Sequence, residues 1–353
     1  MDQCRQAAAA ALKRFPVKHS ELSSKIDAMS KAELHLHLEG SIRPAMAVAL
    51  AARHGVALTE DEVRQRYAYT DFTAFIVAFK WVTSFLRDPA DFALLVADVG
   101  EQLLAQNVVY AEVTLSVGVM MLREQNPQAN LEAILAAAEP FDRKGLRLNW
   151  VFDAVRQFGA DLAYQVVDWA KRCNSPRIVA FGIGGDELSI PTKDFLSVYK
   201  HASYCGLRKL IHAGEIGGPQ RIRDAVELLG VERVGHGIGA IHDPALMDLL
   251  AERRIVLEVC PASNLRTGAL ARQLGNQAVS LAEHPLPKLL RHGIPVVLST
   301  DDPSMFHTSL REEYRHAQEM GLSEVELAEL VANSFTFSFL PAEDRLRLSA
   351  RSA

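Results

Sequence analysis

Cysteine is scarce in this 353-residue sequence, and its few positions form no recognisable pattern. Cys4, Cys173, Cys205 and Cys260 lie far apart, with no C-x-x-C pair among them. This usage argues against a disulfide framework and against a thiolate-rich structural zinc site, and it favours a reducing compartment. We therefore expect a cytoplasmic protein.

Long hydrophobic runs are also missing. No stretch approaches the roughly 20 consecutive apolar residues that a membrane helix needs, so we expect no membrane association. Near the N-terminus, Lys13 and Arg14 interrupt an alanine run, which is more typical of a short amphipathic helix than of an export signal. We predict a helical extension over residues 1–30.

Positive charge is not concentrated in any part of the chain. The formal net charge is −5, and no run of Lys and Arg is interleaved with aromatic residues. Nucleic acid is therefore not an expected partner. The P-C-x-x-C motif of zinc enzymes that deaminate nucleic-acid bases is also absent.

Linkers rich in Pro, Gly or Ser are absent too, so we predict a single domain over residues 31–353. Short apolar runs typical of buried strands alternate with stretches whose apolar residues recur every three or four positions. Eight strands alternating with helices predict an α/β fold, a (β/α)₈ TIM barrel. The strand-like runs span residues 32–38, 108–116, 146–153, 177–184, 207–213, 232–237, 254–260 and 294–300.

The interval between the first two strands is long and predicts a helical insertion over about 41–106. An insertion at this point would lie over the mouth of the barrel. Residues 70–86 form its most apolar and aromatic part. We expect this segment to be a helix that packs into the core, and the alternative is a wall of the substrate site.

Polar residues occupy the carboxyl ends of several predicted strands, where barrel enzymes carry their chemistry. His35 and His37 are two residues apart on one strand, so their rings lie on the same face. His212 ends the fifth strand and Asp301 follows the eighth. Three imidazoles and one carboxylate suit zinc with an open position for water. We predict these four residues as zinc ligands; taken alone, the histidine pair could equally be hydrogen-bonded core residues.

Two further residues accompany the predicted ligands. Glu215 lies three residues after His212 in "HAGE", on the loop that leaves the strand. Its carboxyl group could exchange protons with substrate or water, provided that burial raises its pKa. His236 lies between two glycines in "GHG" and could orient a zinc-bound hydroxide. The alternative for Glu215 is a solvated loop carboxylate.

Five ordered motifs, "HLHLEGS", "GGDE", "HAGE", "GHG" and "STDDP", resemble those of the adenosine deaminase family of the amidohydrolase superfamily. The resemblance runs from about residue 32 to 314. It implies one zinc ion held by the residues already predicted, and hydrolytic conversion of a 6-aminopurine nucleoside and water to the 6-oxopurine nucleoside and ammonia.

The resemblance also implies a role for each site residue. Glu215 would protonate purine N1, and His236 and Asp301 would position the attacking hydroxide. Asp302 would hydrogen-bond N7, and the backbone of Gly185 would contact N3.

One position departs from the typical family motif. Adenosine deaminases read "HLDG", whose Asp contacts the ribose 5′-hydroxyl, whereas this chain carries Glu39. Relatives acting on adenine, or on nucleosides altered at the 5′ position, carry Glu. Adenosine is therefore not the only substrate to consider.

Other segments favour a modified nucleoside. "GGDE" resembles the nucleoside-deaminating branch, and "CPASNLRTGALA" followed by "HPLPKLL" is similar to aminodeoxyfutalosine deaminases. Their substrate, an adenosine with a benzoate-bearing 5′ extension, belongs to menaquinone synthesis. Arg266 could meet its carboxylate, or could be a solvated surface residue.

Three other functions compete with this interpretation. One is an adenine deaminase. Another is a two-metal amidohydrolase, but such enzymes use a Lys at the end of strand four, where this chain has Gly184 and Gly185. The third is a non-catalytic zinc barrel, which would not need Glu215 or His236. The sequence pattern specifies no oligomeric state.

Overall fold

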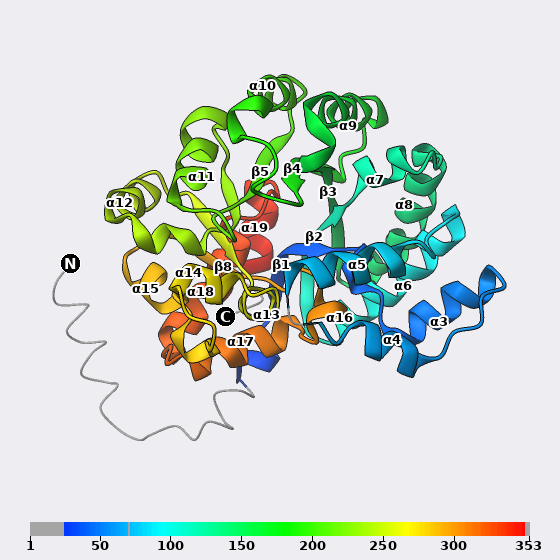
Figure 1. Cartoon of the computed structure of the whole chain (residues 1–353). Helices are drawn as coiled ribbons and strands as arrows, with labels where there is room; N and C mark the ends of the chain where they lie inside the picture. Colours follow the sequence, from blue (N-terminus) through cyan, green and yellow to red (C-terminus); the bar gives the residue numbers. More distant parts are fainter. Residues whose placement is uncertain (1–24, 70, 350–353) are drawn as a thin grey trace.

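The structure is a computed structural model that describes residues 25–69 and 71–349. Its eight strands form one sheet in the order β1 to β8, and every neighbouring pair is parallel. The predicted (β/α)₈ barrel is confirmed (Figure 1). The strands are β1 (Lys31–His37), β2 (Val108–Leu115), β3 (Arg147–Val155), β4 (Ile178–Gly184), β5 (Arg208–Ala213), β6 (Arg233–His236), β7 (Val256–Val259) and β8 (Val296–Leu298).

Asp301 closes the barrel between β8 and β1. Its backbone N–H donates to the carbonyl of His35, and its carbonyl accepts from the N–H of His37, both at 2.8 Å. Leu36 and Asp301 form the corresponding parallel bridge. The residue predicted as a metal ligand is therefore held in place by the same hydrogen bonds that close the sheet.

The helices surround the sheet and bury its outer face. Several begin with proline in the first turn, where the missing N–H costs no hydrogen bond. They are α3 (Pro44–Arg53), α4 (Glu60–Arg66), α5 (Phe72–Thr83), α6 (Pro89–Leu104), α7 (Val117–Leu122), α8 (Pro127–Arg143), α9 (Gly159–Cys173), α10 (Leu196–Tyr204), α11 (Pro219–Asp224), α12 (Pro244–Glu252), α13 (Pro261–Arg266), α14 (Ala269–Leu274), α15 (Leu286–Arg291), α16 (Pro303–Phe306), α17 (Leu310–Glu319), α18 (Glu324–Thr336) and α19 (Ala342–Ser349).

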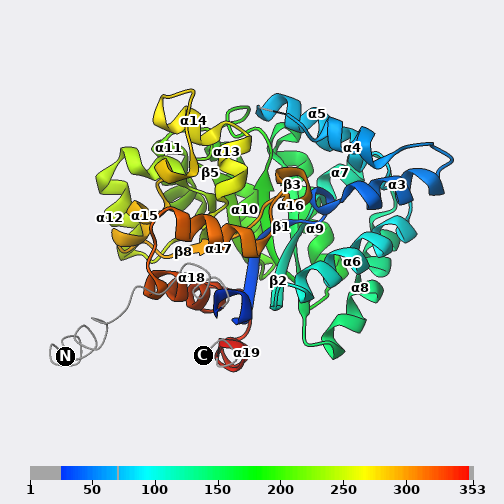
Figure 2. The ribbon, with the colours of Figure 1, turned by 90° about the horizontal axis from the view of Figure 1, so that it is seen from below.

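The segment between β1 and β2 is helical, as the length of the interval predicted. It comprises a 3-10 turn over Glu39–Ser41 and helices α3 to α6. Helix α6 packs against α8 and β2 in the outer ring, so the added part is α3 to α5. Figure 2 shows α5 at the same end of the barrel as α13 and α14, with α19 at the opposite end.

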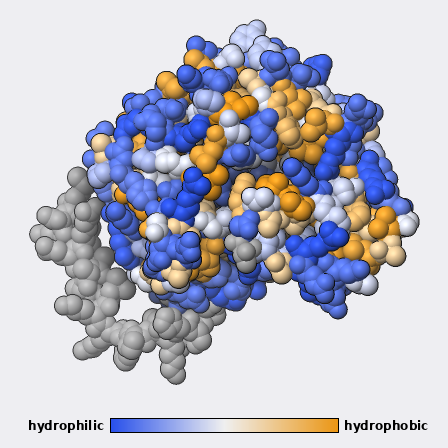
Figure 3. All heavy atoms as spheres, in the orientation of Figure 1, coloured by the Kyte–Doolittle hydropathy of each residue, from blue (hydrophilic) through white to orange (hydrophobic). Residues whose placement is uncertain are grey.

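Two features of α5 follow from its sequence. Asp71 caps its first turn, accepting a hydrogen bond from the N–H of Ala74. Phe75, Ala78 and Val82 are buried, as expected for a packing helix. Hydrophobic side chains also gather on the molecular surface over α5 (Figure 3), so this helix does more than fill the core.

Two further predictions concern the N-terminal extension and membrane-spanning helices. The N-terminal extension over residues 1–30 lies mostly outside the described residues, which begin at residue 25. None of the described helices combines the length and apolar character that a membrane-spanning helix needs.

Candidate active site

The structure brings three predicted ligand histidines together at the carboxyl ends of β1 and β5. Ring nitrogens of His35, His37 and His212 all lie within 4.8 Å of one another. The carboxylate of Asp301 joins them, with Oδ1 3.5 Å from Nε2 of His35 and 3.3 Å from Nε2 of His37. These four side chains therefore form a His/Asp group that can hold a metal ion.

The protonation states and unpartnered nitrogens of these histidines are those that a metal cation requires. The Nε2 atoms of His35 and His37 are buried and have no hydrogen-bond partner among the described residues. Burial lowers the pKa of His37 to about 4, so its ring is neutral and keeps a free lone pair. Burial and the neighbouring imidazoles also lower the pKa of His212. Neutral imidazoles with unused nitrogens are the ligands that zinc takes in proteins.

The pKa of His35 shifts in the opposite direction to those of His37 and His212, because carboxylates face both of its ring nitrogens. Glu258 Oε2 lies 2.7 Å from Nδ1, and Asp301 lies on the Nε2 side. Although burial by itself lowers it, these two carboxylates raise the pKa of His35 well above its ordinary value. Positive charge is thus favoured here, and a metal ion can supply it in place of the proton.

His236 and Asp301 both adopt a backbone conformation that is rare outside glycine. Their φ angles are 62° and 63°, in the left-handed region. Such conformations persist only where the surroundings impose them, and they concentrate at functional sites. Both side chains point into the histidine cluster: Nε2 of His236 lies 3.9 Å from Asp301 Oδ2.

A buried charge network supports His35 from beneath. Glu258 of β7 contacts His35 with one oxygen, and its Oε1 lies 2.5 Å from Nε of Arg233 on β6. Arg233 also pairs with Glu112 of β2, at 2.5 Å. Although burial alone would raise it, the Arg233 guanidinium and the His35 ring hold the pKa of Glu258 below its ordinary value. An ionised Glu258 requires the proton of His35 to lie on Nδ1, which leaves Nε2 free for a metal.

A second chain of hydrogen bonds fixes the proton of His236. The N–H of Leu286 donates to Nδ1 of His284, so the proton of that ring lies on Nε2, 3.2 Å from Oδ1 of Asn264. The amide of Asn264 then donates to Nδ1 of His236 at 3.0 Å. Burial lowers the pKa of His236 to about 4 and that of His284 to about 3, so both rings are neutral. The proton of His236 consequently lies on Nε2, which faces the site.

Glu215 lies within the same group of side chains. Its Oε2 is 3.6 Å from Nε2 of His236. Burial, assisted by the charge of Asp301, raises the pKa of Glu215 well above its ordinary value. Burial thus shifts Glu215 toward the protonated acid that the predicted role requires.

Glu187 holds the loop that carries Glu215. Its carboxylate accepts hydrogen bonds from the backbone N–H groups of Gly214, Glu215, Ile216 and Gly217, at 2.5 to 3.1 Å. The Glu of the "GGDE" motif thus orders the "HAGE" loop, a positioning role that its sequence context did not reveal.

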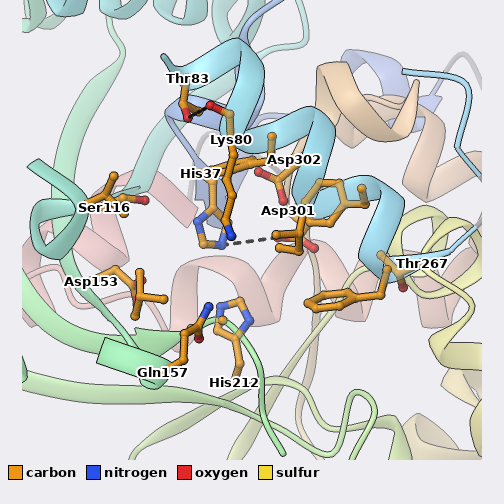
Figure 4. Close-up of a pocket in the computed structure, with 18 of the residues that line it drawn as sticks. His37, Lys80, Thr83, Ser116, Asp153, Gln157, His212, Thr267, Asp301 and Asp302 are labelled. Carbon is orange, nitrogen blue, oxygen red and sulfur yellow. Dashed lines mark hydrogen bonds and ion pairs between the residues drawn. The ribbon is translucent and has the colours of Figure 1, made fainter. Parts of the chain in front are cut away.

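A cavity of about 350 Å³ opens onto the cluster (Figure 4). His37, His212, His236, Glu215, Asp301 and Asp302 line one end of it. Helix α5 also lines the cavity, with Phe72, Phe75, Ile76, Phe79, Lys80 and Thr83. The expected core packing and the alternative, a wall of the site, therefore both apply to this helix, because it buries side chains in the core and also lines the cavity.

Of the four predicted substrate-binding residues, two line the cavity and two do not. Gly185 lines the cavity with a φ of 90°, where an added Cβ would lie 2.5 Å from Oε1 of Gln157. Asp302 also lines it, and burial together with the charge of Asp301 raises the pKa of Asp302. Glu39 is buried, accepts from the N–H of Ser116 at 2.9 Å, and does not line the cavity. Arg266 is exposed and does not line it either.

Comparison with known proteins adds to this geometry. A sequence model of the family described as adenosine deaminase matches residues 30–352. The chain belongs to this family. The resemblance drawn from five motifs is confirmed over nearly the whole chain.

The relatives of this deaminase include proteins named aminodeoxyfutalosine deaminase and proteins named adenine deaminase. Aminodeoxyfutalosine deaminase from Streptomyces avermitilis is 37% identical over 94% of this chain and 92% of its own length. Adenine deaminase from Chelativorans sp. is 32% identical over 91% of this chain and 97% of its own length.

Solved structures agree with the fold and the metal chemistry. The crystal structure of adenine deaminase from Arthrobacter aurescens has a TM-score of 0.85 at 29% identity, covering 92% of this chain and 98% of that one. An amidohydrolase from Burkholderia ambifaria with bound Zn has a TM-score of 0.84 at 25% identity, covering 96% and 93%. The family and these relatives make the chain a hydrolytic deaminase that acts on a small purine compound and water.

Sequence reasoning missed several residues of this deaminase. Glu258 and Arg233 are single charges within apolar strands, a signal that marks a buried partner but does not identify it. Asp153 of β3 lines the cavity, and burial raises its pKa to about 8. Lys80 and Arg123 also line the cavity, although nothing in the local sequence distinguishes them from surface cations.

Proposed function

We propose that this deaminase acts on a 6-aminopurine nucleoside with a substituted 5′ position, of the aminodeoxyfutalosine type. The observation that carries the proposal is the cavity, which continues past the histidine cluster to the apolar face of α5. Its volume of about 350 Å³ lies in the range of about 300–1,000 Å³ that suits ligands larger than a bare purine. The relatives named for aminodeoxyfutalosine are 35–37% identical.

We infer that one zinc ion is held by His35, His37, His212 and Asp301. The unpartnered nitrogens, the neutral rings and the carboxylate within 3.5 Å support this assignment. When bound, zinc lowers the pKa of water and so supplies a nucleophile at neutral pH.

The chain's own residues would then divide the remaining work. Water would add at C6 of the purine and lose one proton to Asp301, while Glu215 gives its proton to N1. As the C6–N bond breaks, the proton on Asp301 would pass to the amino group, which leaves as ammonia, and the remaining hydroxyl proton would return to Glu215 as the 6-oxo group forms. His236 carries its proton on Nε2 and, with Asp301, would hold the attacking oxygen in line with C6. Asp302 would donate to N7, and Gly185 would allow the backbone to approach N3.

Two proposed contacts concern the sugar and its substituent. Oε2 of Glu39 is buried without a hydrogen-bond partner, and a ribose 5′ substituent could supply one after a small movement. Arg266 follows from the sequence resemblance, and its exposed position outside the cavity lining gives that contact no support. Its role stays a prediction.

The test is ammonia release by zinc-replete enzyme with adenine, adenosine, 2′-deoxyadenosine and aminodeoxyfutalosine, compared as kcat/KM. We expect aminodeoxyfutalosine to exceed adenosine by at least tenfold. A preference for adenosine would refute the 5′-substituted substrate and leave a purine-salvage enzyme.

Adenine deamination is the second candidate function. It is favoured by the Chelativorans relative and by the similarity to the Arthrobacter structure. The same assay separates the two, because a site built for adenine would turn over the free base far better than any nucleoside.

Residues 31–353 would form a single metal-dependent hydrolase domain, and the cytoplasmic location and a place in menaquinone synthesis stay predictions. Cys173, Cys205 and Cys260 are free thiols, consistent with a reducing compartment.

A further inference from the structure

Four carboxyl groups and two cationic side chains line the cavity of this deaminase beside the histidines. The carboxyl groups belong to Asp153, Glu215, Asp301 and Asp302, at or just beyond the ends of barrel strands. Apart from histidines, the cationic side chains among its described lining residues are Lys80 on α5 and Arg123 just after α7. A ligand with its purine at the histidine cluster would therefore have two cationic side chains within the same cavity.

Arg123 is held in a defined orientation. Its Nη1 donates to the carbonyl of Thr83 at 2.7 Å, and its Nη2 donates to the hydroxyl of the same residue at 3.0 Å. These bonds leave further N–H groups of the guanidinium unused. No described carboxylate lies within ion-pair distance of Arg123, although its side chain is only partly exposed. Glu39 acts on this guanidinium electrostatically from beyond ion-pair distance. A half-buried, oriented guanidinium with unused N–H groups can in addition bind the anionic group of a ligand.

Lys80 lies one turn before Thr83 on the same face of α5, so the two cations lie on either side of that threonine. Its side chain runs from α5 into the cavity (Figure 4). No carboxylate of the described chain pairs with its amino group either.

The surface around this pair is apolar and aromatic. Phe72, Phe75 and Phe79 line the same wall, and the ring centroids of neighbouring pairs lie 6.0 and 5.9 Å apart. Val119 and Leu122 of α7 continue it. A small anion such as phosphate would leave this surface bare, whereas an aryl group would cover it.

We propose that Lys80 and Arg123 form a carboxylate-binding subsite that selects an aryl carboxylate on the 5′ extension of the substrate. This inference rests on the proposed function and identifies the part of the cavity that would enforce it. It assigns the carboxylate contact to the insertion and to α7, in place of Arg266.

The experiment compares free aminodeoxyfutalosine with its methyl ester, which keeps the aryl group and removes the charge. The variants are Lys80→Met, Arg123→Met, Arg123→Lys and Arg266→Met, with Lys288→Met as a matched control, and AMP is measured as a third substrate. Lys288 is an exposed lysine of α15 outside the cavity lining. The measured quantity is the ratio of kcat/KM for the acid to that for the ester.

We expect Lys80→Met and Arg123→Met each to lower this ratio by roughly 10–100-fold, the value of a charge-assisted hydrogen bond. Arg123→Lys should fall between Arg123→Met and wild type, and Lys288→Met should match wild type. Lys80 is exposed, so its variant decides the question if Arg123→Met fails to fold.

Three outcomes would overturn the subsite. The first is an unchanged ratio in both methionine variants, and the second is a loss confined to Arg266→Met. The third is a preference of the wild-type enzyme for AMP over both acid and ester, which would indicate a phosphate site. Turnover of adenine alone, with neither 5′-substituted compound accepted, would instead refute the proposed function itself.

Discussion

Replacing Glu258 with glutamine should weaken zinc binding, although this residue is not itself one of the predicted ligands. Glu258 is fully buried, with one oxygen 2.7 Å from Nδ1 of His35 and the other 2.5 Å from Nε of Arg233. His35 Nδ1 donates to one oxygen and the Arg233 guanidinium forms an ion pair with the other, so an ionised carboxylate suits both neighbours. The arrangement keeps the proton of His35 on Nδ1 and its Nε2 lone pair directed at the site.

Glutamine can satisfy only one of these neighbours. If its oxygen accepts from Arg233, its NH₂ group faces Nδ1 of His35 and drives the ring proton to Nε2, where a metal would bind. If it is flipped, its NH₂ group faces the buried guanidinium, donor against donor. Loss of such a supporting carboxylate typically costs about 10–100-fold in metal affinity, which is about 1.4–2.8 kcal/mol.

The assay is a competition for zinc between enzyme and a chelator of known affinity. Glu112→Gln is the matched control, because Glu112 pairs with the same Arg233 but does not contact His35. Both variants remove a buried charge beside Arg233 and should lower the Tm of the metal-free protein. Only Glu258→Gln should also lower zinc affinity at least tenfold. Equal losses in the two variants, or none in either, would show that the His35 tautomer does not govern binding.

Three further substitutions test the site. His212→Ala should lose zinc and activity together, and full zinc occupancy measured by atomic absorption would remove His212 from the ligand set. Glu215→Gln should retain zinc but lower kcat by about 10²–10⁴-fold, since the amide cannot give up a proton in the same way; near-normal turnover would end its assignment as the acid. In Gly235→Ala, the new Cβ would lie 2.8 Å from Cε1 of His35 and 3.2 Å from Cδ2 of His212, so we expect a loss of about 1–3 kcal/mol in unfolding free energy, with weaker zinc binding. Gly218→Ala, where nothing lies within 4 Å of the added Cβ, should behave as wild type in denaturant titrations.

The barrel itself could be predicted from sequence because parallel strands buried on both faces appear as apolar runs. β1 and β5 begin and end within about two residues of the runs that predicted them. The four predicted metal ligands could also be identified from sequence. A histidine or aspartate at the end of a buried strand is costly to bury unless it has a polar partner or a metal. Position in the fold and chemical type therefore pointed to the same four side chains.

The supporting residues could not be assigned in this way. Glu258, Arg233 and Glu112 lie on β7, β6 and β2, and only the closure of the barrel brings them together. No sequence pattern marks Arg123, because the residue that orients it, Thr83, lies on another helix 40 positions away in the sequence. For residues 70–86 the sequence left core packing and a wall of the substrate site open, because a helix can be amphipathic toward a cavity as well as toward a core.

The groups proposed to act on the purine and those proposed to bind its substituent come from different parts of the fold. This separation can account for relatives that share a family and differ in substrate. The groups proposed to act on the purine come from strand ends and from loops that the barrel fixes, Asp301 through the same hydrogen bonds that close the sheet. The groups beyond the purine come from α5 and the start of the loop after α7, which pack onto the barrel without forming it. Substitutions on α5 should therefore change what the proposed substrate can carry at its 5′ end without disturbing the cluster of His35, His37, His212 and Asp301. Specificity in this deaminase should consequently respond to Lys80 and Arg123, and the chemical step should respond to Glu215 and His236.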